Sequence, residues 1–427
     1  MTLSENTPYV FELDSVGMLY TSIISKHWDN IYRFTIILKE DVDKALLQKA
    51  LNETYKRFPS IAVRLEKNFF NYYLKSLTEA PKVYSQGERP FNFIDKEELK
   101  ENAFRFVAGE KSVTLEMFHA VTDGTGTLAF LKTTVAEYLR LKYGVEIPKE
   151  QGIYDISQNP PLEELENSYE KHAGVYRKLP SEPNALRLSG KKEPAGVLNV
   201  TGFDLSADVL LQKAKEFDVS VTVLLSGIMM YTLQKLQSES AIDKSKPVRI
   251  RIPVNLRGLF GSCTMRNFSL LITPQLDTHK RSYSFEEVCE VITKCLQTEI
   301  TKEKFALQMA ANQKKVNIKI IKILPLWVKS FIVKAGYCLF GESKSTITVS
   351  NVGVMKFPEE MLPYIDDMEL IMATQLTSPY NCAALSFKDK VHINFVRNTA
   401  DSELEDCYEK VLKEFGIAAV RHERKFN

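Results

Sequence analysis

The stretch from residue 148 to residue 200, rich in proline and polar side chains, most constrains how this chain folds. It shows little apolar periodicity, and its prolines stand at 148, 160, 161, 180, 183 and 194. Such a stretch is typical of a connection between folded units. A chain of 427 residues is also long for one domain of roughly 150 residues. We therefore predict two units, residues 1–175 and 176–427.

Strand and helix patterns of similar size occur on both sides of this connection. In the first half we predict a buried strand over 30–39, an amphipathic helix over 41–58 that stops at Pro59, and strands over 62–66, 68–76 and 112–118. In the second half we predict helices over 206–217 and 222–236, and strands over 199–205, 248–257, 345–353, 368–376, 381–388 and 390–397. The pattern predicts a mixed α/β fold in each half, although no repeat is visible residue by residue.

Two later helices begin at sequences typical of a capping box. Ser284 precedes Glu287 by three residues, and Ser402 precedes Glu405 by the same spacing. In a capping box the hydroxyl and the carboxylate each accept a hydrogen bond from a free backbone N–H of the first turn. We therefore expect both pairs to start helices.

Composition excludes several classes of function. The formal net charge is +2, so an electrostatic nucleic-acid binder is not expected. The six cysteines form no C-x-x-C pair, which argues against zinc ribbons and disulfide scaffolds, and we predict no metal site and a reducing cytoplasm. The first residues contain Glu5, Glu12 and Asp14 where a signal peptide requires an apolar core. No apolar stretch is long and uncharged enough to predict a transmembrane helix.

An apolar stretch with regularly placed lysines, residues 317–340, allows two interpretations. Ile318, Ile321, Leu324, Trp327, Phe331 and Ile332 form one stripe at helical spacing, interrupted by Pro325. Such a stripe suits weak contact with a membrane surface or the passage of a lipid-like substrate. A helix packed against a sheet has the same period. We expect the packed helix and a protein that stays monodisperse without detergent.

The segment over 112–144 contains the candidate chemistry. A predicted strand ends at Phe118, His119 and Asp123 follow on a turn, and an amphipathic helix begins after Gly124. A dinucleotide-binding G-x-G-x-x-A motif, from Gly124 to Ala129, is an alternative. Here a polar loop separates the strand from the first glycine, and no second strand of a βαβ unit follows, so that alternative is not favoured.

Three motifs in this order resemble one family. FHAVTDGTG resembles the H-x-x-x-D-G motif of the chloramphenicol-acetyltransferase-like acyltransferases, IPVNLRGLF resembles their P-V-x-x-R strand, and VSNVGVM resembles their S-N-x-G strand. With the helix that ends in K-R-F-P, the resemblance covers nearly the whole chain and is closest to the stand-alone alcohol acetyltransferases. Phe118 precedes His119, whereas condensation domains and wax-ester synthases have a second histidine there. The plant-type D-F-G-W-G motif is absent.

The resemblance implies a fold and a set of site residues. Two subdomains, each a mixed sheet with helices, would form a pseudo-dimer with a central tunnel. His119 would be the general base, a role that suits an imidazole with a pKa near roughly 6.5. Asp123 would face away from the substrate and pair with Arg257, which from the residues alone is equally a surface charge. Asn351 would orient substrate or stabilise an oxyanion, or else form an ordinary Asn-x-Gly turn. Gly124 would let the turn pass close to His119.

By this resemblance we expect transfer of an acyl group, acetyl among them, from acyl-CoA to the hydroxyl of a small-molecule alcohol. Acyl-CoA would be a co-substrate, with no permanently bound cofactor. One alternative keeps the site but takes a thioester from an acyl carrier protein and forms an amide or an ester. Another is a catalytically silent relative that binds an acyl ligand or a protein partner.

Overall fold

The first half of the chain forms a five-stranded sheet in the order β13-β2-β7-β6-β5. The structure is a computed structural model that describes residues 8–24, 30–89, 94, 96–194, 196–240, 243–316, 323–374 and 378–426. The strands are β2 (Ile31–Leu38), β5 (Tyr84–Ser85), β6 (Phe104–Ala108), β7 (Ser112–Phe118) and β13 (Ile365–Ile371). Antiparallel pairing places Tyr32 of β2 opposite Met117 of β7. The end of β7, where His119 follows, therefore lies beside the start of β2.

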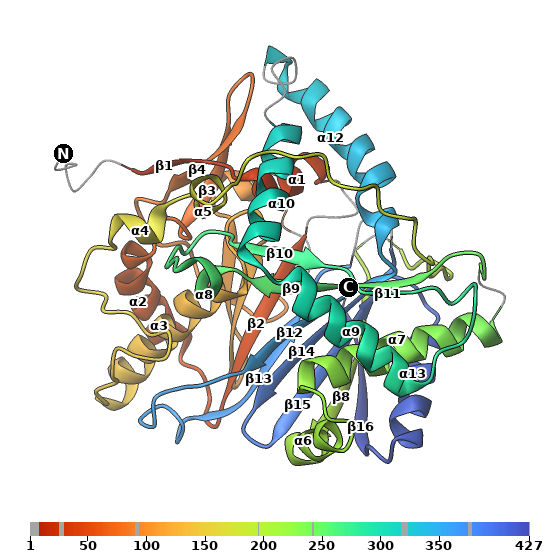
Figure 1. Ribbon diagram of the computed structural model, residues 1–427. Helices are drawn as coiled ribbons and strands as arrows, with labels where there is room; N and C mark the ends of the chain where they lie inside the picture. Colours follow the sequence, from red (N-terminus) through yellow and green to blue (C-terminus); the bar gives the residue numbers. More distant parts are fainter. Residues whose placement is uncertain are drawn as a thin grey trace.

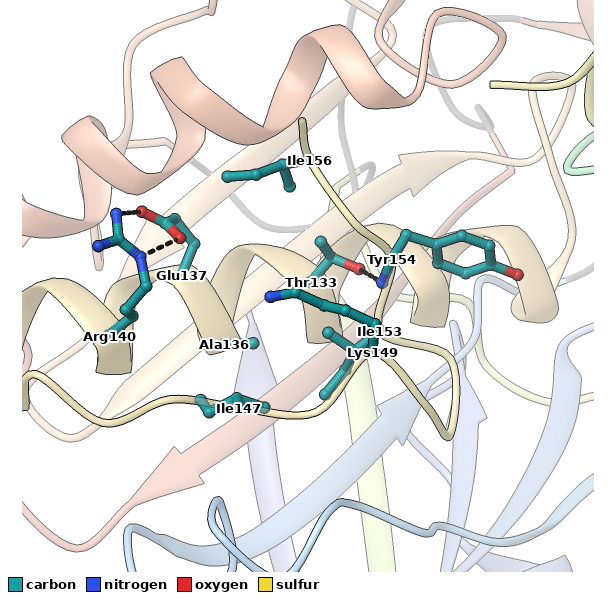
Figure 2. A pocket seen from close by; sticks show the side chains of 9 residues that line it. All are labelled: Thr133, Ala136, Glu137, Arg140, Ile147, Lys149, Ile153, Tyr154 and Ile156. Atoms are coloured by element: carbon teal, nitrogen blue, oxygen red, sulfur yellow. Dashed lines mark hydrogen bonds and ion pairs between the residues drawn. The ribbon is translucent and has the colours of Figure 1, made fainter. Parts of the chain in front are cut away.

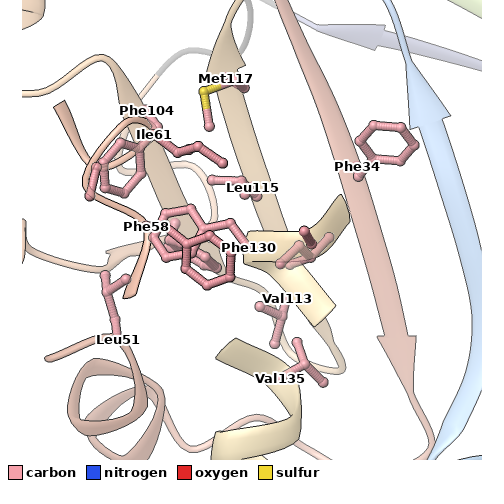
Figure 3. Close-up of a cluster of buried hydrophobic side chains, with 14 of the residues drawn as sticks. Phe34, Leu51, Phe58, Ile61, Phe104, Val113, Leu115, Met117, Phe130 and Val135 are labelled. Atoms are coloured by element: carbon pink, nitrogen blue, oxygen red, sulfur yellow. The ribbon is translucent and has the colours of Figure 1, made fainter. Parts of the chain in front are cut away.

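Helices α2 (Lys44–Thr54) and α3 (Gly124–Tyr143) pack together and cover this sheet (Figure 1). Asp43 caps α2, and Gly144, in a left-handed conformation with φ 69°, ends α3. Figure 3 shows the core beneath them, where the ring of Phe130 from α3 lies 5.1 Å from that of Phe58 and 5.3 Å from that of Phe104. This packing holds the first turn of α3, and so Asp123, in place.

The second half forms a larger sheet in the order β10-β9-β12-β14-β15-β8-β16, with β11 also paired to β9. Its strands are β8 (Leu198–Ser206), β9 (Val248–Asn255), β10 (Ser269–Ile272), β11 (Gln275–Leu276), β12 (Ile347–Val354), β14 (Tyr380–Phe387), β15 (Lys390–Arg397) and β16 (Ala419–Phe426). Its helices are α6 (Ala207–Glu216), α7 (Val221–Glu239), α9 (Phe285–Glu299) and α13 (Glu403–Glu414). Helix α7 packs against both α9 and α13 over a second apolar core. The predicted mixed α/β fold is confirmed.

The connection between the two halves and several further elements complete the fold. The connection contains α4 (Leu162–Leu165) and α5 (Ser168–Lys171), and its described residues form no strand before β8. The remaining elements are the strands β1 (Val10–Glu12), β3 (Val63–Lys67) and β4 (Tyr72–Ser76), which form a three-stranded sheet, and the helices α1 (Ser15–Ile23), α8 (Arg257–Phe260), α10 (Lys302–Val316) and α12 (Leu326–Phe340). Arg57 and Glu164 form a buried bidentate ion pair of 2.7 and 2.9 Å that holds the connection against the first half.

Strand β13 comes from the second half of the chain but pairs with β2 in the first sheet. The division at residue 175 stays a prediction, and the second half of the chain contributes this strand to the first sheet. His392 on β15 bridges them, since its Nδ1 lies 2.7 Å from Asp204 on β8 and its Nε2 lies 2.8 Å from Asp367 on β13. Burial disfavours protonation of His392, but the hydrogen bonds to Asp204 and Asp367 outweigh it and raise its pKa to about 9.

We expect His392 to make stability fall with alkalinity. The pKa of His392 is higher in the folded protein than the ordinary value of 6.5. Its contribution to the free energy of unfolding is therefore complete below about pH 6.5 and is lost as the pH rises through 9. At about 1.4 kcal/mol per pH unit, the interval from 6.5 to 9 corresponds to about 3 kcal/mol. Urea unfolding between pH 6 and 9.5 measures it, and the His392→Gln protein should lose this dependence while a variant of the exposed His279, His279→Gln, keeps it. An unchanged slope in His392→Gln would contradict the bridge.

Three expectations from the sequence are wrong or incomplete. The Ser284 capping box is confirmed, but Ser402 makes no capping bond, because Glu405 is fully buried and binds Arg397 instead. The charged strand β16 was not predicted, although it pairs with β8 along its whole length. Helix α12 packs on α1, yet Trp327 and Phe331 are exposed rather than buried. Ile318 and Ile321 lie outside the described residues.

Within the described part of the chain, no single helix has the length and apolar character needed to cross a membrane. Helices α6 and α7 meet the combined requirement of length and apolar composition only when taken as a pair, and they are bent by 84° to each other.

Candidate active site

His119 follows β7 on a turn whose backbone is held from two sides. Its N–H donates to the carbonyl of Asn30, which precedes β2, over 3.2 Å. Its own carbonyl accepts a hydrogen bond of 3.0 Å from the side-chain amide of Asn267, which comes from the second half of the chain. Both halves therefore set the position of His119.

The His119 imidazole lies between two tyrosine rings and is only partly buried. The ring centroid of Tyr20 on α1 is 5.1 Å away, and that of Tyr32 on β2 is 4.7 Å away. The Nδ1 atom is buried and accepts or donates no hydrogen bond with any described residue. Burial lowers the pKa of His119, against the opposing effects of its own carbonyl, Asp123 and Asn267. The imidazole is therefore neutral at pH 7, as a general base must be.

Asp123 does not contact His119 and instead holds the start of α3. Its Oδ1 accepts from the backbone N–H of Thr125 over 3.1 Å, as an N-cap. Its Oδ2 accepts from Arg257 Nη1 and from the backbone N–H of Phe268, both over 2.8 Å. The carboxylate is buried, and both of its oxygens are used. Asp123 thus joins α3 to two segments of the second half.

Arg257 is buried and fully bonded, so the alternative of a surface charge at a strand end is wrong. Besides Asp123, its Nε donates to the carbonyl of Thr264 over 2.8 Å and its Nη2 to that of Arg266 over 2.7 Å. Its Nη1 also lies 3.2 Å from the Oδ1 of Asn255, at the end of β9. One guanidinium therefore holds the 264–268 segment against the turn that carries His119.

Asn351 on β12 makes local bonds. Its Oδ1 accepts from the N–H of Gly353 over 2.9 Å, and Gly353 has φ 76°. The expected strand-ending turn is instead an irregularity within β12, because the strand continues to Val354 with a shift in register after Asn351. Its Nδ2 donates to the hydroxyl of Thr222 over 3.3 Å. The next residue, Val352, lies close to Gly124, because a Cβ added to Gly124 would be 4.0 Å from the Val352 side chain. Strand β12 therefore reaches the start of α3, and the role of Asn351 toward substrate stays a prediction.

The close approach predicted for Gly124 occurs at Gly126 instead. A Cβ on Gly124 would make ordinary contact with the Phe34 ring at 3.5 Å, and it would not approach His119. A Cβ on Gly126 would lie 2.2 Å from the hydroxyl of Thr122 and 2.4 Å from the carbonyl of Met265. The Thr122 hydroxyl itself donates to that carbonyl over 2.5 Å. Only glycine therefore lets α3 pack against the Met265 segment at this point.

This difference predicts opposite results for two neighbouring substitutions. Gly126→Ala should force α3 away from the Met265 segment and destabilise the protein by roughly 1–3 kcal/mol, the usual cost of overpacking. Gly124→Ala, at the first turn of the same helix, should change the free energy of unfolding by less than about 0.5 kcal/mol. Urea unfolding of both variants measures this. Equal losses in the free energy of unfolding would show that α3 and the Met265 segment can move apart at Gly126 without destabilising the protein.

Four residues of the site were not predicted from the sequence: Tyr20, Tyr32, Gly126 and Asn267. Tyr32 could have been found if the pairing of the two predicted strands had been known. Ile31 lies opposite Phe118, which precedes His119, so the neighbouring Tyr32 lies close to the His119 turn. Its hydroxyl bonds to Thr127 over 2.6 Å, which ties β2 to α3. No sequence pattern indicated Asn267, because it lies far from His119 along the chain.

The small hollow drawn in Figure 2 is separate from this site. It lies between the later turns of α3 and residues 147–156 of the connection, and it encloses about 10 Å³. Tyr154 donates its N–H to the Thr133 hydroxyl over 3.1 Å, and Glu137 binds Arg140 at its edge. A space of this size holds at most a single water molecule, so it is packing space of the connection.

No protein-family model matches this chain, and no curated protein matches it in sequence. Solved structures match it over nearly its whole length. TRI101 of Fusarium sporotrichioides, complexed with coenzyme A and T-2, has a TM-score of 0.65 and 12% identity, with 97% of this chain and 99% of that chain covered.

Two further solved structures show the same fold. TRI3, a trichothecene 15-O-acetyltransferase from Fusarium sporotrichioides, has a TM-score of 0.60 and 11% identity, covering 97% of this chain and 96% of that one. The first condensation domain of the CDA synthetase has a TM-score of 0.59 and 14% identity, covering 96% and 99%. The chain thus has the same two-subdomain fold as these structures, which is the fold that the motifs implied.

Proposed function

We propose that this protein transfers an acyl group from an acyl-CoA thioester to the hydroxyl of a small-molecule alcohol. The observation that carries the proposal is the neutral, partly accessible His119 imidazole, held on a turn by bonds to its backbone from both halves of the chain. Because its Nδ1 is buried, the proposed proton acceptor is Nε2. Asp123, the other residue of the motif, is turned away and bound to Arg257. An imidazole held in place but left free for a proton is what a general base requires. Solved structures of the same fold contain coenzyme A.

The proposed reaction needs no covalent intermediate on the protein. His119 takes the hydroxyl proton as the alcohol oxygen attacks the thioester carbonyl, which forms a tetrahedral oxyanion. Collapse of that intermediate breaks the carbon–sulfur bond, and the imidazolium returns the proton to the departing CoA thiolate. The products are an ester and free CoA. Asn351 is the proposed donor to the oxyanion, and its Nδ2 would exchange the Thr222 hydroxyl for that oxygen.

A thiol-release assay tests this proposal against its alternatives. The protein is mixed with acetyl-CoA and longer acyl-CoAs, and free thiol is followed with neutral alcohols, with amines and with neither. We expect release that depends on an alcohol. Release stimulated by amines alone would replace the ester reaction with amide formation, and binding of acyl-CoA without release would indicate a silent ligand-binding relative. A carrier-protein donor would be indicated if only acyl carrier protein thioesters reacted.

The depressed pKa of His119 predicts the acid side of the pH profile. Because the folded pKa lies below 6.5, the base is deprotonated at neutral pH, and kcat/KM should be constant from pH 7 to 8. It should fall about tenfold per pH unit only below the pKa of His119. The thiol-release rate between pH 4.5 and 8 measures the limb. A limb with its midpoint above pH 7 would mean that another group is the base.

A further inference from the structure

An exposed aromatic platform lies at one end of the molecule. It consists of Phe69 and Phe70, at the turn between β3 and β4, and of Trp327 and Phe331 on α12. Trp327 is 76% exposed, Phe331 73% and Phe69 68%. Figure 1 shows α12 and the β3–β4 hairpin projecting at the same end of the molecule. Large apolar side chains that are exposed together at one end of a folded protein indicate an interaction site.

The platform is built by bonds that hold its two segments together. The Leu326 N–H donates to the carbonyl of Phe69 over 3.0 Å. The Lys329 ammonium is buried, and it donates to the carbonyl of Phe70 over 3.0 Å and to the Oδ1 of Asn71 over 3.1 Å. Thus α12 turns a lysine inward and aromatic rings outward, the reverse of a helix that packs on a core. The exposed rings are held in fixed positions by polar contacts beneath them.

Positive charge surrounds the platform. Lys67 adjoins the Phe69 turn, and Lys334 lies on α12 two turns from Trp327. Lys96 is close to both: burial lowers the pKa of Lys96 most, and the charges of Lys67 and Lys334 lower it further. No carboxylate of the described residues lies within ion-pair distance of these three lysines. A hollow of about 440 Å³ nearby is also lined by Lys67 and Lys96, while the acids on its wall, Glu66 and Glu97, are bound to other cations.

We propose that the aromatic platform docks on the surface of an anionic lipid bilayer. Aromatic rings beside unpaired lysines are the chemistry of the bilayer interface, where rings enter the headgroup layer and ammonium groups meet anionic lipid. The core of a protein interface is depleted in lysine, so a protein partner fits this surface less well. This inference does not depend on the proposed acyl transfer, and it would bring the protein to a surface where apolar substrates are concentrated.

Cosedimentation of the full chain with vesicles tests the proposal. The vesicles are phosphatidylcholine alone, or phosphatidylcholine with 30% phosphatidylserine, at low and high salt. We expect binding to the anionic vesicles and at least a tenfold loss of partitioning in Trp327→Ser/Phe331→Ser. The matched control, Leu162→Ser/Val175→Ser, removes two equally exposed apolar side chains elsewhere and should bind like the wild type. Lys67→Gln/Lys334→Gln should weaken binding at low salt about fivefold per lysine, whereas Lys191→Gln/Lys410→Gln should not.

Tryptophan fluorescence shows whether the platform itself enters the bilayer. The chain has two tryptophans, so in a Trp28→Phe background Trp327 reports alone. Its emission should shift to the blue on anionic vesicles and be quenched by brominated lipid. Binding that persists in Trp327→Ser/Phe331→Ser, or no binding at all, overturns the proposal. Sedimentation velocity that shows self-association, abolished by the same double variant, would assign the platform to a second copy of the chain instead.

Discussion

The His119→Ala protein should release thiol from acyl-CoA roughly 10²–10⁴-fold more slowly than the wild type, because the alcohol would lose its general base. Its stability should change little. The imidazole makes no side-chain hydrogen bond through Nδ1 among the described residues, so its removal leaves no buried charge or donor without a partner. The loss concerns mainly the contacts with the Tyr20 and Tyr32 rings, about 1 kcal/mol.

Turnover under saturating acyl-CoA and a thermal melt, measured on the same preparation, separate chemistry from folding. His279→Ala is the matched control, since it removes an exposed histidine and should leave both quantities unchanged. A His119→Ala protein with full turnover would end the assignment of His119 as the base. A large fall in melting temperature would mean instead that the ring contacts hold the turn.

Loss of Asp123 should damage folding more than chemistry. Asp123→Ala leaves the buried Arg257 cation without its carboxylate and the Phe268 N–H without its acceptor. Removing one partner of a buried ion pair costs on the order of 3–5 kcal/mol. Activity should fall as a consequence, because the turn that carries His119 depends on the same contacts. Asp123→Asn, which keeps the shape and an acceptor oxygen, should cost less.

Arg257→Ala should resemble Asp123→Ala, with an added loss because the Thr264 and Arg266 carbonyls also lose a donor. The double variant should be less damaging than the sum of the two single variants, since no unpaired charge remains. Urea unfolding of the four proteins gives the coupling energy directly. Purely additive losses would contradict a functional pairing of the two charges and would leave the role of His119 unaffected.

Most strands and helices could be predicted because their periodicity is a local property. The alternation of β7 and the helical spacing of α3 both appear in the residues themselves, and the structure has both elements. Strand β16 could not be predicted in this way, because its charged residues match no buried pattern. It is a strand because β8 offers it a free edge to pair with.

Long-range contacts also redirected residues whose local pattern was clear. Glu405 has the spacing of a capping box, but a buried Arg397 binds it more favourably than a solvent-exposed helix end does. The stripe on α12 has the spacing of a core helix, yet Lys329 is the residue that turns inward, where it binds the Phe70 carbonyl and Asn71. In both cases the local pattern gave the helical spacing correctly, but the side chains contact other residues than the pattern predicted.

At the candidate site, the motif was enough to predict that His119 and Asp123 share one turn between a strand and a helix, because that spacing is local. Their surroundings depend on how distant segments pack in the folded chain. It placed Arg257 against Asp123 across 134 residues, turned that carboxylate away from the imidazole, and made Gly126 rather than Gly124 the point of close contact. The physical reason is that ion pairing and close packing depend on distances between segments, which the order of residues along one segment does not contain.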